Sequence, residues 1–269
     1  MRSETIAMSF LPSTSDCNLS GVGVLVTRAE HQATTLCRMI AARNGRAVRF
    51  PAVEIIDPAD PQRVAEQLSH FADYQMAVFV SPNAVLWGIK QLPDQKIPPG
   101  VALATVGKRT AQTLAEAGYA VDVVPETSFD SEGLLATPEL KDVAGKRILI
   151  LRGNGGRELL ADTLVERGAT VDFVEVYQRR CPDTDPDPLI RRWRDDVDVV
   201  TVSSNILLDN LFTMLGEAGQ PLLQQTPMIV ISDRMRQHAR ELGCHEVYLS
   251  RSADEQDLFE AICLWAGNR

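Results

Sequence analysis

An internal repeat is the feature of this sequence that most constrains its fold. A short apolar run that ends at Arg28 is similar to one that ends at Arg152, 124 residues later. Residues 77–83 match residues 199–205 with a separation of 122, and residues 104–118 match residues 229–243 with a separation of 125. Three blocks that keep their order and nearly the same separation indicate a duplicated unit, and each copy is long enough to form a domain.

Each copy alternates apolar, β-branched runs with amphipathic segments. Residues 78–80 are apolar at every position, which is typical of a strand covered on both faces. Residues 110–117 have apolar side chains at helical spacing, and Gly118 then predicts the end of a helix. Strands that alternate with helices predict parallel sheets with right-handed crossovers. The expected fold class is therefore α/β, with two similar doubly wound parallel-sheet domains.

Composition excludes several classes of partner. The 269 residues are 45% hydrophobic and 23% charged, as in a soluble globular protein. The net charge of −9 argues against a general nucleic-acid or membrane-surface binder. No apolar run approaches the roughly 20 residues of a membrane span, and residues 1–19 lack the features of a secretory signal. We expect those residues to form a mobile extension and the protein to be a monomer.

The five cysteines are scattered along the chain. Because they form no Cys-X-X-Cys pair, the sequence supports neither a disulfide framework nor a zinc site, and a reducing cytoplasm is expected. Cys244, His245 and His238 are a weak alternative as metal ligands, since no second cluster completes the set. The glycine-rich residues 153–156 lack the spacing of a P-loop or a dinucleotide site, so they are interpreted as the edge of a cleft.

Four polar turns follow predicted strands, which is where open parallel sheets bind ligands. A serine or asparagine in such a turn can simply cap the next helix. Matching turns in both copies favour a further role, because helix N-termini present free N–H groups and a positive dipole end to an anion. Basic residues in and near the turns add to this. The candidate binding residues are Arg28, Ser81, Pro82, Asn83, Gly107, Lys108, Arg152, Ser203, Ser204, Asn205, Ser232 and Arg234.

The order of these blocks resembles the uroporphyrinogen-III synthase family. The similarity is carried by VTR at 26–28, FVSPNAV at 79–85, TVGKRTAQTLAEAG at 105–118, EGLL at 132–135, LRGNGGRELL at 151–160 and EVYQR at 175–179. It continues through VTVSSN at 200–205 and VISDRMRQHARELG at 230–243. Each motif alone is modest, but together they cover about residues 21–265 in the family's order.

The resemblance implies two α/β domains joined by a two-stranded antiparallel linker, with the active site in the cleft between them. It also implies a discontinuous first domain, which the repeat alone would not suggest. The implied boundaries are residues 20–51 with 180–269 for domain 1 and 55–175 for domain 2. The implied linker strands are residues 50–56 and 173–179.

The implied reaction closes hydroxymethylbilane to uroporphyrinogen III, with loss of water and inversion of the terminal pyrrole ring. No metal or organic cofactor is implied. A transient contact with hydroxymethylbilane synthase, which makes the unstable substrate, is the one protein partner to consider. The substrate is rich in carboxylates, which agrees with the anion-binding turns.

The resemblance also singles out candidate catalytic residues. Tyr177 matches a tyrosine of the family's cleft, where a phenol could hydrogen-bond the leaving hydroxyl group. Thr110 matches a hydroxyl position in the first-copy turn. Some members of the family have threonine at the equivalent turn of the second copy, where this chain has Met235, so a side-chain hydroxyl there is not required. Two alternatives stay open: a catalytically inactive anion-binding relative, and a two-lobed binding protein of the exported kind.

Overall fold

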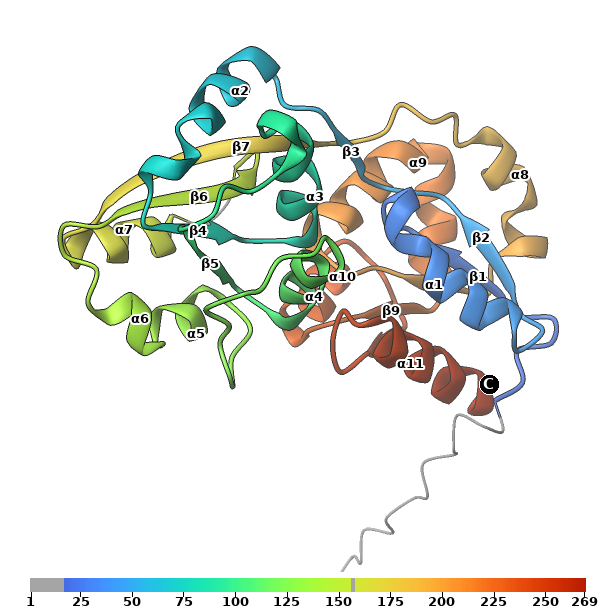
Figure 1. Cartoon of the computed structure of the whole chain (residues 1–269). Helices are drawn as coiled ribbons and strands as arrows, with labels where there is room; N and C mark the ends of the chain where they lie inside the picture. The colour runs from blue at the N-terminus through green and yellow to red at the C-terminus, as the bar shows by residue number, and fades with distance from the viewer. Residues whose placement is uncertain (1–16, 156–157) are drawn as a thin grey trace, which may run out of the picture. The chain divides into compact units, whose positions relative to one another are not determined.

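The computed structural model describes residues 17–155 and 158–269, which divide into two compact units. Unit 1 contains the described residues up to Glu54 together with Cys181–Arg269, and unit 2 contains Ile55–Arg180. Each unit is built around one five-stranded sheet (Figure 1). The chain therefore begins unit 1, completes unit 2 as an insertion, and then returns to finish unit 1.

The sheet of unit 1 is parallel and has the strand order β10-β9-β8-β1-β2. Its strands are β1 (Gly23–Val26), β2 (Arg46–Arg49), β8 (Val199–Thr201), β9 (Met228–Val230) and β10 (Val247–Leu249). Its helices are α1 (Glu30–Ala41), α8 (Asp187–Asp196), α9 (Asn205–Gln225), α10 (Asp233–Glu241) and α11 (Glu255–Gly267). Residues of α1 and α11 form one buried cluster with the sheet, and residues of α8, α9 and α10 form another. Both faces of the sheet are thus covered, which explains why β1 and β8 are buried at every position.

The sheet of unit 2 has the order β3-β7-β6-β4-β5. Its strands are β3 (Glu54–Ile56), β4 (Met76–Phe79), β5 (Ala102–Thr105), β6 (Arg147–Gly153) and β7 (Thr170–Arg180). Its helices are α2 (Pro61–Ser69), α3 (Pro82–Gln91), α4 (Lys108–Glu116), α5 (Ser131–Leu135), α6 (Pro138–Lys141) and α7 (Leu159–Glu166), with short 3-10 turns at Phe71–Asp73 and Pro93–Gln95. One buried cluster contains residues of α2, α3 and α4, and the other contains residues of α5, α6 and α7.

The two sheets confirm the expected α/β class and the similarity of the two copies. β1 lies between β8 and β2 in one sheet, and β6 lies between β4 and β7 in the other, with parallel pairing throughout. β9 then corresponds to β5. Even β10 has a counterpart, because Val123 makes an isolated parallel bridge to Ala104 of β5.

The register of one repeat block differs from the sequence match by one residue. Ser81 is the N-cap of α3, and Ser204 is the N-cap of α9. The equivalent residues are therefore Ser81 and Ser204, whereas the sequence match paired Ser81 with Ser203 and Asn83 with Asn205. The match failed because it aligned identical asparagines, whereas the helix start is set by the serine that caps it.

Only residues 54–56 of the strand expected at 50–56 form a strand, because Phe50 and Ala52 are buried in the core of unit 1. The strand expected at 173–179 lies within β7 of the unit 2 sheet. β3 is shorter than expected and lies next to β7 at the sheet edge. β7 is longer than expected and pairs in parallel with β6 from Thr170 to Tyr177. Its length follows from its apolar residues, since Val174, Val176 and Tyr177 are all buried in unit 2.

The expectation of a mobile extension is wrong for residues 17–19, and the expectation that the sequence supports no disulfide is wrong as well. Residues 17–19 belong to unit 1, because Leu19 is fully buried against its core, and residues 1–16 lie outside the described residues. Cys17 also forms a disulfide with Cys263 of α11, with Cα atoms 5.6 Å apart. The sequence contained no signal for this bond because the two cysteines are 246 residues apart and meet only through the fold. Cys37, Cys181 and Cys244 are free thiols.

None of the helices within the described ranges combines the length and the apolar character needed to cross a membrane.

Candidate active site

The strand orders identify where each sheet should bind a ligand. In unit 1 the crossovers of the chain run outward in opposite directions from β1 and β8, so the strand order reverses between these neighbours. In unit 2 the strands at the equivalent place are β6 and β4. Open α/β sheets bind ligands beyond the carboxyl ends of the strands at such reversals. The turns after these four strands contain most of the candidate residues.

In unit 2, Tyr177 and Ser81 come together at the carboxyl ends of β7 and β4. The phenolic oxygen of Tyr177 lies 3.2 Å from Oγ of Ser81, and either group can donate. Oγ of Ser81 also accepts a hydrogen bond from the backbone N–H of Ala84, as the N-cap of α3. Pro82 is the first residue of α3, and Asn83 is buried in the same turn.

The ring of Tyr177 is held by close packing. Only 4% of the residue is exposed, and its ring centroid is 6.2 Å from that of Trp87 on α3. Gly153, at the end of β6, faces the ring so closely that a Cβ atom there would lie 2.5 Å from two ring atoms. Gly153 is therefore required by the position of Tyr177. The phenol is therefore fixed in place by the residues around it.

Arg152 lies on the other side of the sheet from Tyr177, because its partner Phe173 packs against the cluster of α5, α6 and α7, whereas Tyr177 belongs to the cluster of α2, α3 and α4. Its guanidinium stacks on the ring of Phe173 at 3.9 Å from the centroid, and Nη2 lies 3.4 Å from Oε1 of Glu175. Nε and Nη1 are buried without a hydrogen-bond partner among the described residues. Arg152 therefore does not join Tyr177 and Ser81.

The turn before α4 supplies three more candidates. Gly107 is the N-cap of α4 and has no side chain to occupy the first N–H groups of the helix. Lys108 is exposed, with its Nζ atom 4.6 Å above the ring of Phe129. Thr110 is only 3% exposed. The buried position of Thr110 favours a role in packing, whereas Gly107 leaves backbone donors available.

In unit 1 the equivalent turns are capped by serines. Oγ of Ser204 accepts a hydrogen bond from the N–H of Leu207, and Oγ of Ser232 accepts one from the N–H of Met235. Ser203 is half-buried between β8 and this cap. Met235 corresponds to Thr110, since each is the third residue of its helix, and it lies in the buried cluster beneath α10.

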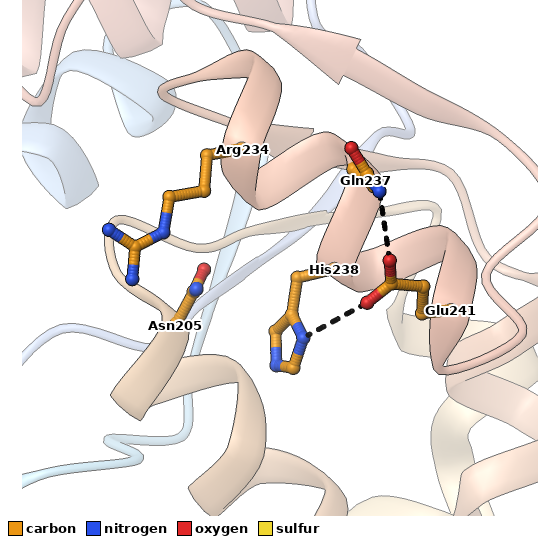
Figure 2. Close-up of a pocket in the computed structure, with 5 residues that line it drawn as sticks. All are labelled: Asn205, Arg234, Gln237, His238 and Glu241. Atoms are coloured by element: carbon orange, nitrogen blue, oxygen red, sulfur yellow. Dashed lines mark hydrogen bonds and ion pairs between the residues drawn. The ribbon is translucent and has the colours of Figure 1, made fainter.

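A pocket of about 280 Å³ opens between the first turn of α9 and one side of α10 (Figure 2). It is lined by the predicted residues Asn205 and Arg234, by His238, which the sequence indicated only as a weak metal ligand, and by Gln237 and Glu241, which the sequence did not indicate. Nε2 of His238 lies 2.6 Å from Oδ1 of Asp209 on α9. Nε2 of Gln237 donates to Oε1 of Glu241 at 3.0 Å. The spacing of His238 and Glu241 from Arg234 along α10 is the signal that could have placed them on one face.

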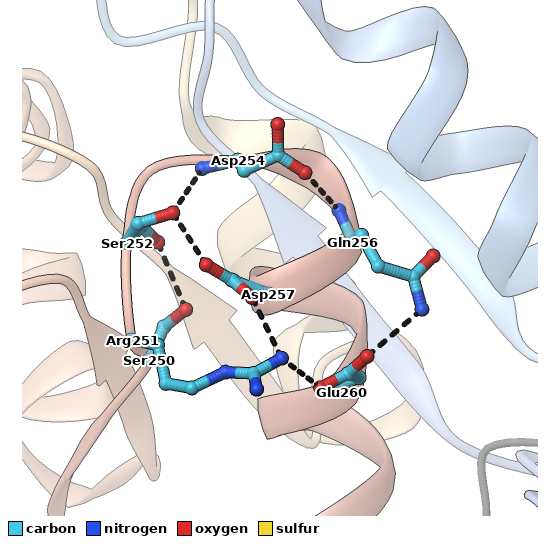
Figure 3. Close-up of polar contacts among 7 residues, drawn as sticks. All are labelled: Ser250, Arg251, Ser252, Asp254, Gln256, Asp257 and Glu260. Carbon is cyan, nitrogen blue, oxygen red and sulfur yellow. Dashed lines mark hydrogen bonds and ion pairs between the residues drawn. The ribbon is translucent and has the colours of Figure 1, made fainter. Parts of the chain in front are cut away.

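Arg28 is engaged within unit 1. Its guanidinium donates to the backbone oxygen of Ala253, and Nη1 lies 3.6 Å from Oε1 of Glu255. Ala253 belongs to the segment between β10 and α11, and Glu255 is the first residue of α11. Figure 3 shows how polar contacts hold this segment, including Ser252 with Asp257 and Arg251 with Glu260. Arg28 thus anchors a loop, and a ligand would have to compete with those bonds.

The weak metal alternative has no support among the residues described. No group of three His, Cys, Asp or Glu side chains in residues 17–155 and 158–269 is arranged to hold a metal ion. Cys244 is buried, and burial raises the pKa of its thiol to about 11. His238 lines the pocket of α9 and α10 instead. The loop at residues 153–156 is described only as far as Gly155, where the N–H contacts Glu175.

Two doubly wound α/β units with polar turns beyond the ends of their parallel strands define a class of ligand-binding α/β protein. Comparison with known proteins identifies the family. The family model described as "Uroporphyrinogen-III synthase HemD" matches residues 34–260. The chain belongs to the uroporphyrinogen-III synthase family.

Individual relatives agree with this membership. The uroporphyrinogen-III synthase of Escherichia coli K12 is 33% identical over 245 residues, which covers 90% of this chain and 100% of that protein. The enzyme of Salmonella typhimurium is 31% identical with the same coverage. Among solved structures, uroporphyrinogen III synthases from Thermus thermophilus (a mutant form) and Helicobacter pylori superpose with TM-scores of 0.60 each. They are 16% and 15% identical, and the matches cover 91% and 92% of this chain and 100% of each solved chain, so they support the fold.

Proposed function

We propose that this protein converts hydroxymethylbilane to uroporphyrinogen III. The observation that carries the proposal is membership of the family over nearly the whole chain, including the segments that hold Ser81, Tyr177, Asn205 and Arg234. In the classification of enzymes the protein would be a lyase that removes water and closes a ring. No metal or organic cofactor is needed for this chemistry.

The chemical steps begin at the hydroxymethyl group of the linear substrate. Its C–O bond breaks, and the departing hydroxide takes up a proton to leave as water, so that a cationic azafulvene remains. The substituted α-carbon of the terminal ring attacks this cation and forms a spiro intermediate. That intermediate fragments and recloses with the terminal ring inverted, and loss of a proton restores the aromatic ring.

Tyr177 is the residue best placed to assist departure of the hydroxyl group. Its phenol is buried, fixed by Gly153 and Trp87, and hydrogen-bonded to Ser81. A phenol can donate to the leaving oxygen while it accepts from the Ser81 hydroxyl. We assign Thr110 a weaker part, since its equivalent in the other unit, Met235, has no hydroxyl group.

Orientation of the substrate is the larger task. Spontaneous closure gives the symmetrical isomer I, so the enzyme must favour attack by the more hindered carbon. Correct orientation of reacting groups can lower a barrier by several kcal/mol, up to roughly 7–11 kcal/mol in ideal cases. We propose that the substrate carboxylates bind the backbone N–H groups and basic side chains at the starts of α3, α4, α9 and α10.

We place the protein in the cytoplasm and treat it as a monomer, with hydroxymethylbilane synthase as a transient partner. In the cytoplasm, glutathione and thioredoxin would act to reduce the Cys17–Cys263 bond.

The function is tested with a coupled assay. Porphobilinogen and hydroxymethylbilane synthase generate the substrate, the products are oxidised, and isomers I and III are separated by chromatography. Isomer III that depends on this protein supports the proposal. Isomer I alone, from folded protein, would leave the inactive anion-binding relative as the better account.

A further inference from the structure

The pocket between α9 and α10 contains a guanidinium group, on Arg234, without a carboxylate partner among the described residues. It also contains an amide oxygen, on Asn205, without a hydrogen-bond donor among them. Arg234 is exposed on the first turn of α10, and no carboxylate within residues 17–155 and 158–269 lies within ion-pair distance of it. Arg236, two residues later, is paired with Asp233. In a chain with a net charge of −9, an unpaired guanidinium at a pocket indicates a site for an anion.

Asn205 supplies the second group. Its Oδ1 atom is buried and has no hydrogen-bond donor among the described residues. A buried acceptor without a donor is unfavourable, and such groups call for a partner. In Figure 2, the amide of Asn205 and the guanidinium of Arg234 approach the same space from α9 and α10. A matching ligand therefore has an anionic group and, close to it, a hydrogen-bond donor.

The acidic residues around the pocket are already engaged. Asp209 and Glu241 lie 2.6 Å and 4.0 Å from the two ring nitrogens of His238, and Glu241 also accepts from Gln237. The contact between His238 and Asp209 joins α10 to α9, so it fixes the width of the pocket. These contacts reduce the repulsion that the two carboxylates would exert on an anion, because each carboxylate already has a hydrogen-bond donor beside it.

The size of the pocket limits the ligand to a small group. At about 280 Å³, it lies just below the roughly 300–1,000 Å³ found for sites that hold drug-sized ligands. A simple carboxylate would satisfy Arg234 but would offer no donor to Asn205. A pyrrole ring with carboxylate side chains offers both groups on one rigid frame.

We propose that this pocket binds one carboxylated pyrrole ring of the substrate. Arg234 pairs with a side-chain carboxylate, and Oδ1 of Asn205 accepts the hydrogen bond of the ring N–H. His238 is a positioning residue that holds α9 and α10 at the required separation. This inference rests on the proposed function and adds to it the part of the substrate that unit 1 recognises.

The test uses two small probes and the full chain. The first probe is a single pyrrole with one acetate and one propionate side chain, and the second is the same compound methylated on the ring nitrogen. Each is titrated into ¹⁵N-labelled protein, and amide shifts are followed by NMR. The shifts should centre on the first turns of α9 and α10, and the unmethylated probe should bind about three- to tenfold more tightly, as one hydrogen bond allows.

Matched variants assign the two contacts. Arg234→Gln should weaken both probes by about tenfold or more, as loss of a charge-assisted hydrogen bond does. Arg236→Gln, on the same helix but already paired, should change both affinities by less than about twofold. Asn205→Ala should abolish the preference for the unmethylated probe. Equal affinities of the two probes in wild-type protein, or equal effects of the two arginine variants, would overturn the proposal.

The isomer assay separates this proposal from the proposed function. If wild-type protein forms isomer III while the probes leave the first turns of α9 and α10 unshifted, the pocket assignment is wrong and the function stands. If the probes bind as predicted but no isomer III forms, the function is wrong, and the pocket remains a pyrrole-binding site.

Discussion

The hydroxyl groups of Tyr177 and Ser81 lie 3.2 Å apart and join the end of β7 to the first turn of α3. Ser81 is also the N-cap of that helix, so the same oxygen both starts the helix and positions the phenol. The two residues are 96 positions apart in the chain. Their contact connects the residue that caps α3 to the phenol that we propose assists the reaction.

Removing the Tyr177 hydroxyl should reduce activity far more than stability. Tyr177→Phe keeps the packed ring, so we expect kcat for isomer III to fall by about tenfold or more, within the range for loss of one acid–base contact. The free energy of unfolding should change by less than about 1.5 kcal/mol, the value of one hydrogen bond. Both are measured by the isomer assay and by urea denaturation.

The matched control is Tyr74→Phe. The Tyr74 hydroxyl donates to Oδ2 of Asp172 at 2.8 Å, and burial raises its pKa to about 12. This variant loses one tyrosine hydrogen bond in the same unit without touching Ser81, so kcat should stay within about twofold of wild type. Equal losses of kcat in the two variants would show that the Tyr177 hydroxyl has no special role in the reaction.

The raised pKa of Tyr74 also leads us to expect that the free energy of unfolding depends on pH. Its pKa is about 12 in the folded protein, above the ordinary tyrosine value of 10.0. Because folding raises the pKa, the protonated phenol stabilises the folded state. This contribution is fully present below the pKa of the unfolded state, and it is lost as pH rises from 10 to about 12. The difference in unfolding free energy between wild type and Tyr74→Phe should therefore shrink over that interval. A constant difference would contradict the assignment.

Gly153→Ala should displace the ring of Tyr177. The added Cβ atom would lie 2.5 Å from ring atoms, closer than any normal contact. Overpacking of this kind costs about 1–3 kcal/mol and should lower activity together with stability. Gly267→Ala, at the end of α11, is the contrasting variant, because the added Cβ atom would meet no described atom within 4 Å. A Gly153→Ala protein with wild-type activity would show that the ring position does not matter.

Met235→Thr tests the departure from the family pattern. Met235 is 5% exposed and packs in the cluster beneath α10, so a threonine would bury a hydroxyl and leave a cavity. We expect a loss of about 2–4 kcal/mol in unfolding free energy and no gain in activity. Met235→Leu, which keeps the volume, should cost less than about 1.5 kcal/mol. Increased kcat in Met235→Thr would contradict this interpretation.

The Cys17–Cys263 bond should stabilise unit 1. It ties the segment before β1 to α11, and reduction should lower the free energy of unfolding by about 2–4 kcal/mol. Cys17→Ser should reproduce the effect of a reducing agent and be insensitive to it, whereas Cys181→Ser, at a free thiol, should behave as wild type. Titration of thiols in denaturant provides the direct check. If all the cysteines titrate as free thiols in protein that has never been reduced, the bond does not form.

The repeat predicted most of the fold, because strands buried on both faces and glycine-terminated helices leave clear local patterns. It did not reveal the contacts that depend on distant segments. Cys17 meets Cys263 only after the whole of unit 2 has been inserted between them. His238 was visible only as a weak metal ligand, since its partner Asp209 lies on another helix. Asn205 and Arg234 were predicted separately, and the pocket that they share emerged only from the packing of α9 against α10.

The central claim is tested most directly with purified hydroxymethylbilane, without the enzyme that makes it. The fraction of isomer III is measured while the concentration of this protein is increased at constant substrate. The account predicts that the fraction rises from near zero to near one, and that Tyr177→Phe requires much more protein to reach the same fraction. A fraction that stays near zero at every concentration of folded wild-type protein would contradict it.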